Sequence, residues 1–129
     1  MDIHDFSRKD IGELGERVAA EYLFRNGFKV LGRNIQLRIG ELDIVALKDD
    51  CLHIVEVKSL VCSSFPSKGY GAYSPADNLH QRKIRTVRRA GEWYVAGTGW
   101  DKEWQIDAVL VWLREPDGMA RVEYYPQIL

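Results

Sequence analysis

The sequence predicts an α/β fold in which a mixed β-sheet is flanked by helices. Two segments repeat apolar residues at helical spacing, and short apolar or alternating stretches typical of strands lie between and after them. The expected order is α-β-β-β-α-β plus a C-terminal strand, and such mixing of helices and strands builds helices against a sheet. A chain of 129 residues with ordinary globular composition fits one domain, residues 1–129, around one core.

Turn signals and periodicity set the expected bounds of the elements. Asn26-Gly27 stops the first helix, and Asp117-Gly118 indicates a turn near the end of the chain. The predicted elements are a helix over about 9–27, a short strand over 28–31, a segment over 33–39 leading into a hairpin, a long loop over 59–77, a helix over about 75–95, and strands over 104–112 and 121–125.

The hairpin carries four ionisable groups in otherwise apolar arms. With its turn over 48–50, Asp43 faces Glu56, and Glu41 faces Lys58. Strand side chains alternate in direction, so this register puts all four groups on one face. An even slip of the register would keep them together, whereas an odd slip would separate them.

This arrangement predicts a metal site. Facing carboxylates with Cβ atoms about 5 Å apart repel each other, and a hard divalent cation such as Mg²⁺ or Mn²⁺ removes the repulsion. Lys58 beside the metal would orient an attacking water or stabilise charge on a phosphate. The alternative is a solvated strand end with an ordinary ion pair between Glu41 and Lys58, which contributes little. Polar groups that interrupt a strong apolar pattern favour the functional interpretation.

The charge distribution predicts a second feature, a basic helix. Net charge is −1, but residues 81–89 carry five basic side chains and no acidic one. Such a local patch can bind phosphate in a near-neutral protein; the alternative is a solvated helix face. The predicted nucleic-acid-binding residues are Arg38, Arg82, Lys83, Arg85, Arg88 and Arg89.

Composition argues against membrane and secreted classes. No apolar run is long enough to cross a bilayer, and the polar, acidic start is unlike a signal peptide. Cys51 and Cys62 have no metal-ligand spacing, and free thiols are expected of a cytoplasmic protein. His53 points to the face opposite Glu56 and is expected to be structural.

Motifs along most of the chain resemble a known family. In chain order, the motifs begin with Gly15-Glu16 in the first helix. Gly40-Glu41-Leu42-Asp43 and Val55-Glu56-Val57-Lys58 follow in the hairpin. The last are Gln81-Arg82-Lys83 in the second helix and Ile106-Asp107-Ala108-Val109 in a late strand. This order resembles the restriction-endonuclease-like superfamily of PD-(D/E)xK nucleases. Within that superfamily it is similar to the YraN family, a bacterial group related to archaeal Holliday junction resolvases.

The resemblance implies a restriction-endonuclease-like core and a role for each matching residue. Asp43, Glu56 and the backbone carbonyl of Val57 would hold Mg²⁺ or Mn²⁺, and Lys58 would assist the water. Glu16 would join the site from the first helix, and Gln81 would lie near it. Leu60, His80 and Gln36 stand where the family often has a basic residue, which bears on DNA affinity and removes no metal ligand.

The sequence therefore predicts a cytoplasmic, metal-dependent endonuclease acting on DNA, including branched DNA such as Holliday junctions. Because a junction needs two cuts, a homodimer would suit the activity. A DNA-binding module of the same fold without turnover is the first alternative. An interaction protein with a merely structural acidic cluster is the second.

Overall fold

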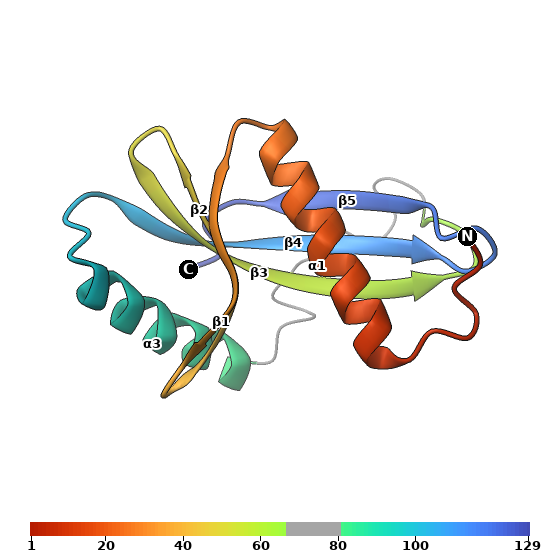
Figure 1. The fold of residues 1–129 in the computed structure, drawn as a ribbon, viewed down its shortest axis with the longest axis horizontal. Coiled ribbons are helices and arrows are strands. Elements are labelled where there is room, and N and C mark those ends of the chain that lie inside the picture. The colour runs from red at the N-terminus through yellow and green to blue at the C-terminus, as the bar shows by residue number, and fades with distance from the viewer. Residues whose placement is uncertain (67–80) are drawn as a thin grey trace.

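The computed structural model describes residues 1–66 and 81–129. Its elements are α1 (Arg8–Arg25), β1 (Lys29–Leu37), β2 (Gly40–Lys48), β3 (Cys51–Cys62), α3 (Gln81–Thr98), β4 (Trp104–Arg114) and β5 (Ala120–Tyr125). The order confirms the predicted α-β-β-β-α-β sequence with one further strand. Figure 1 shows α1 lying across β3, β4 and β5, and α3 toward the left end of these strands.

The five strands form one open, mixed sheet. Their spatial order is β1-β2-β3-β4-β5. β1, β2 and β3 are successively antiparallel, β3 and β4 are parallel, and β4 and β5 are antiparallel. Parallel neighbours need a long crossover, and α3 lies within the connection that joins β3 to β4.

The two helices cover opposite faces of this sheet. On one face, Leu14, Ala19 and Leu23 of α1 pack in a buried cluster that includes Val55. On the other face, Val87 and Ala90 of α3 pack in a cluster with Ile54, the residue before Val55 in β3. Successive strand residues point to opposite faces, so β3 is buried from both sides.

α1 begins at a capping box. The side chain of Ser7 accepts from the backbone N–H of Asp10, and the Asp10 carboxylate accepts from the N–H of Ser7. The helix ends at Arg25 with Asn26 as its C-cap, and Gly27 follows at φ +86°, where a residue without Cβ is favoured. The predicted stop signal is confirmed.

The hairpin register is confirmed over its paired part. Val45 lies opposite Ile54, and Leu47 lies opposite Leu52. Asp49 and Asp50 have φ values of 51° and 58°, the conformation of a two-residue turn that matches strand twist. The paired ladder ends at Ile44 and Val55, one position before Asp43 and Glu56 would meet.

Two predicted boundaries were wrong. The strand β3 extends to Cys62, so the expected loop from residue 59 starts too early, because β3 pairs with β4 as far as Cys62 and Arg114. β1 is one strand with an irregularity between Val30 and Gly32, rather than two segments. The second helix is described from Gln81, and the rest of its predicted start lies outside the described residues.

The cysteines and the helices bear on two expectations about the class of the protein. Cys51 and Cys62 are both free thiols, as predicted. Among the described residues, neither helix is long and apolar enough to cross a membrane.

Candidate metal and nucleic-acid site

The candidate site forms where β2 leaves β3. Beyond the last paired position, the backbone N–H of Val57 donates to Asp43 Oδ2 at 2.9 Å instead of continuing the ladder. A strand residue directs its N–H and its carbonyl to the same edge. The carbonyl of Val57, the predicted backbone ligand, is therefore on the edge of β3 that Asp43 occupies.

Asp43 and Glu56 are poorly compensated carboxyl groups. Burial raises the pKa of Asp43, and the hydrogen bond from the Val57 N–H opposes that effect only in part. Burial, followed by repulsion from Asp43, raises the pKa of Glu56 to about 8. Glu56 is 4% exposed. The protein thus holds two acids together where ionisation of both is unfavourable.

A lysine of α3 contacts Glu56 of this carboxyl pair. Lys83 Nζ lies 3.1 Å from Glu56 Oε1. Burial lowers the pKa of Lys83, but the attraction and hydrogen bond of Glu56, together with the charges of Asp43 and Glu41, outweigh burial and leave the pKa above its ordinary value. The predicted contact of Lys83 with nucleic acid stays a prediction. Lys83 is exposed, and it continues the helical stripe of the buried Val87 and Ala90, which directs it toward Glu56.

α1 contributes a third carboxylate, as expected. Gly15 lets the helix approach Ser59 of β3, since a Cβ at this position would overlap the serine side chain. The next residue, Glu16, is thereby brought toward the gap between the strands. Burial and the charge of Asp43 raise the pKa of Glu16.

Asn34 of β1 links the outer carboxylates of the cluster. With its amide nitrogen turned toward them, Asn34 donates to Glu16 Oε1 at 2.8 Å and to Glu41 Oε1 at 3.2 Å. Its backbone has φ +50°, a conformation uncommon for residues other than glycine and tolerated best by Asn and Asp. This side chain sets the spacing between a helix residue and a strand residue.

A cavity of about 830 Å³ opens on these groups, and its lining includes Glu16, Asn34, Glu41, Asp43 and Lys58. Lys58 is exposed at its wall. Among the described residues, Glu41 and Lys58 form no ion pair within 4 Å, although both face the cavity. The alternative of an ordinary ion pair between them is therefore not found. The paired ladder ends before the predicted Glu41–Lys58 position, and Glu41 is held by Asn34.

The donor set fits a hard divalent cation in its chemistry. Mg²⁺ is commonly held by one or two carboxylates, with water and substrate phosphate completing the shell. Asp43 and Glu56 provide such a pair, and the edge of Val57 lies beside them. Within residues 1–66 and 81–129, no group of three or more His, Cys, Asp or Glu side chains is arranged to hold a metal.

The basic helix is partly confirmed as a charged surface. Arg85, Arg88 and Arg89 are exposed along α3. Arg88 is paired with Glu92 at 3.3 Å, whereas Arg85 and Arg89 form no ion pair with any described residue. The side chains of Gln81 and Arg82 lie outside the described part of the chain. Arg38 is exposed in the turn between β1 and β2.

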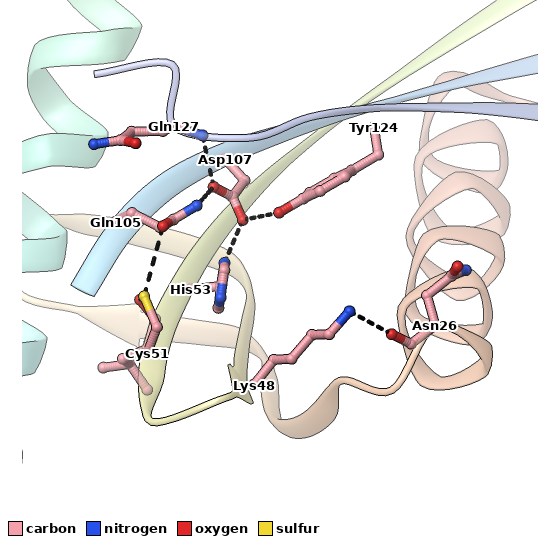
Figure 2. A network of polar contacts seen from close by, with 9 residues as sticks. Asn26, Lys48, Cys51, His53, Gln105, Asp107, Tyr124 and Gln127 are labelled. Atoms are coloured by element: carbon pink, nitrogen blue, oxygen red, sulfur yellow. Dashed lines mark hydrogen bonds and ion pairs between the residues drawn. The ribbon is translucent and has the colours of Figure 1, made fainter. Parts of the chain in front are cut away.

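A second buried carboxylate has a different environment, shown in Figure 2. Asp107 of β4 is fully buried and accepts from His53 Nδ1 at 2.6 Å and from the Tyr124 hydroxyl at 2.6 Å. The Gln105 amide donates at 2.7 Å, and the backbone N–H of Gln127 at 2.8 Å. Burial acts to raise the pKa of Asp107, but these hydrogen bonds lower it. His53 is structural here, as predicted.

Sequence reasoning missed three features of these sites. Asn34 was noted only as part of a motif, and its unusual backbone could not be inferred from one residue. The ion pair of Lys83 was hidden because the lysine sits within a run of arginines. Asp107 was placed near the start of a strand, and a charged residue within an apolar strand was the signal that a buried network surrounds it.

Comparison with known proteins places the chain in a family. The sequence profile described as "Uncharacterised protein family UPF0102" matches residues 15–111. The chain belongs to UPF0102. This is the YraN family that the motif order resembles, and the matched residues contain both arms of the hairpin and all of α3.

Relatives in UPF0102 match over most of their length. A UPF0102 protein of Syntrophotalea carbinolica is 36% identical over 124 residues, covering 94% of this chain and 92% of the relative. A UPF0102 protein of Campylobacter fetus is 37% identical over 100 residues, covering 78% and 81%. A third, from a Nitratiruptor species, is 35% identical over 101 residues with the same coverage.

Proposed function

We propose that this UPF0102 protein is a metal-dependent endonuclease that hydrolyses DNA phosphodiesters, including those of branched DNA, on a restriction-endonuclease-like core. The observation that carries the proposal is the buried, poorly compensated pair of Asp43 and Glu56 at the gap between β2 and β3. A mixed sheet with helices on both faces and the carboxylates on its central hairpin agrees with such a core.

In this proposal each residue of the site has a distinct task. Asp43, Glu56 and the Val57 carbonyl would hold Mg²⁺ or Mn²⁺, which when bound polarises the phosphate and activates water. Lys58, exposed on the cavity wall, would orient the water or stabilise charge on the phosphate. Glu16 and Glu41, spaced by Asn34, would position further water around the cavity. Gln81 would lie near the site, as the family resemblance implies.

DNA would follow the arginines of α3 toward the cavity. Arg85 and Arg89 are exposed, one helical turn apart, and free of carboxylate partners among the described residues. Trp93, which is 58% exposed, continues the same line by one more turn. A base can stack on such a ring while the guanidinium groups contact phosphates. Arg38, Arg82 and Arg88 extend the proposed surface, and a homodimer in the cytoplasm would supply paired cuts.

The direct test measures cleavage of labelled four-way junction, flap, nicked and linear DNA, with Mg²⁺ or Mn²⁺ and with chelator. We expect metal-dependent cleavage that disappears in Asp43→Asn and Lys58→Ala, while Lys102→Ala retains it. Lys102 is the matched control because it is exposed and paired with Asp50 at the hairpin turn. If wild-type protein cuts none of these substrates with either metal, the catalytic proposal fails.

One observation favours a DNA-binding module without turnover as the second candidate. Lys83 already forms an ion pair with Glu56 in the absence of a metal. In that case wild-type protein binds DNA equally well with chelator and with Mn²⁺, and it cuts DNA in neither condition.

The DNA surface has its own test, independent of cleavage. Charge reversal at Arg85 and Arg89 should weaken binding and reduce the slope of log K against log salt by about 2, because two phosphate contacts are lost. The exposed Lys29 and Lys102, both reversed to Glu, are the control for net charge. An unchanged salt slope in the double variant would remove α3 from the binding surface.

A further inference from the structure

Lys83 occupies the position of a cation beside the carboxylate pair. Its ammonium lies 3.1 Å from Glu56 Oε1, and the charges of Asp43 and Glu41 also act on it. The side chain of Glu56 is 4% exposed, whereas that of Lys83 is 50% exposed. The acid is therefore fixed in the core, and the lysine approaches it from solvent.

The location of Lys83 on α3 explains this contact. Lys83, Val87 and Ala90 are spaced at i, i+4 and i+7, so they share the face of the helix that packs on the sheet. Val87 and Ala90 are buried. Lys83 extends that buried stripe at the first turn of the described helix, whereas Arg85 and Arg89 face solvent.

A lysine in this position would compete with a divalent cation. Both would lie against the carboxylate of Glu56, and two positive centres so close together repel each other. Lysine has a flexible four-carbon stem and a strongly hydrated head. Because half of its side chain is exposed, it can leave Glu56 for water without disturbing the packing of Val87.

We propose that Lys83 is a built-in counter-ion, which stabilises the carboxylate pair in the metal-free protein and leaves Glu56 when a divalent cation binds. The inference rests on the metal site of the proposed function. Displacement frees an ammonium group at the start of the basic helix, where it contacts a DNA phosphate. Metal and DNA then strengthen each other's binding by the same factor, since coupling between two ligands is reciprocal.

The test measures Mn²⁺ binding by calorimetry on metal-stripped protein, without any DNA or cleavage. Lys83→Gln removes the competing charge and should bind Mn²⁺ roughly fivefold more tightly than wild type, the effect of losing an ion pair of about 1 kcal/mol. Lys83→Arg retains the charge and the fold, and should bind no more tightly than wild type. Arg85→Gln is the matched control, since it loses the same charge from the same helix without contacting Glu56.

The outcomes separate this inference from the proposed function. If wild-type protein binds Mn²⁺ and Lys83→Gln binds it equally or more weakly, the counter-ion role is overturned. The nuclease proposal then still stands. An equal gain in Arg85→Gln also overturns it, because the effect would then come from net charge alone. If Lys83→Gln binds more tightly but no DNA is cut, the counter-ion role stands and catalysis fails. Absence of Mn²⁺ binding in every variant overturns both.

Discussion

Asp107 and Glu56 lie on adjacent strands at neighbouring positions of the sheet, on opposite faces, and their environments differ sharply. Asp107 pairs in register with Val55, and Glu56 with Ala108. Asp107 receives four hydrogen bonds, as Figure 2 shows, and its pKa is lowered. Glu56 faces a second acid and a half-exposed lysine, and its pKa is raised to about 8. Burial acts in the same direction on both, so the donors around each carboxylate decide the outcome.

This difference separates a structural carboxylate from a candidate functional one. The donors to Asp107 come from two neighbouring strands and from the chain after β5, so the charge joins these segments. Asp43 and Glu56 have fewer donors than two ionised acids need, and a bound cation would supply the missing compensation. The first group should therefore govern stability, and the second should govern ligand binding.

The largest expected effect on stability comes from removing the Asp107 carboxylate. Asp107→Ala leaves His53, Tyr124 and the Gln127 N–H without their buried acceptor, and should lower the free energy of unfolding by about 3–5 kcal/mol. Urea denaturation measures this change, and exposed Asp101→Ala is the control. A loss below about 1 kcal/mol would show that Asp107 does not organise this end of the sheet.

A smaller loss is expected when only one donor is removed. Tyr124→Phe deletes the hydroxyl that donates to Asp107 and should cost about 1.5–3 kcal/mol, the range for a hydrogen bond to a charged group. Tyr22→Phe, in a ring that packs against Tyr124, removes a hydroxyl without removing a bond to Asp107. Equal losses in the two variants would contradict the assigned role of the hydroxyl.

The pH dependence should have opposite signs at the two carboxylates. The pKa of Glu56 rises from 4.5 to about 8 on folding, so the folded chain binds more protons between these values and its stability falls as pH rises. The pKa of Asp107 is lowered from 3.8, so its contribution is present above that pH and is lost as pH falls through the folded value.

Glu56→Gln tests the first of these signs in chelator. Wild-type protein should lose at least about 1.4 kcal/mol relative to the variant between about pH 5 and pH 8.5, the equivalent of one unit of pKa shift. Denaturation curves across this range provide the measurement. Parallel stability curves for the two proteins would mean that Glu56 titrates normally.

The smallest expected effect on stability comes from Lys58. Its side chain is exposed on the cavity wall, so Lys58→Ala should change the free energy of unfolding by less than about 0.5 kcal/mol. Cleavage, if Lys58 acts on the water, should fall roughly 100-fold or more. Activity lost in step with stability would place Lys58 in the fold rather than in the chemistry.

The local parts of the site were predictable from the chain. Alternation in two apolar arms and a polar turn was enough to set the register of Val45 and Ile54, because side-chain direction along a strand has a period of two. A helix stop at Asn26-Gly27 and a turn at Asp117-Gly118 have similarly local causes. The end of β3 was missed, because its pairing with a strand some fifty residues later determines where it ends.

The sequence by itself determined which residues could form a site: two acids and a lysine on a hairpin, a glutamate on the first helix and a basic second helix. Only the tertiary structure decided their partners. It separated β2 from β3 beside Asp43, placed Lys83 rather than Lys58 against Glu56, and joined Glu16 to Glu41 through Asn34. These contacts join residues on different elements, and their energies depend on burial and on neighbouring charges, which no local pattern encodes.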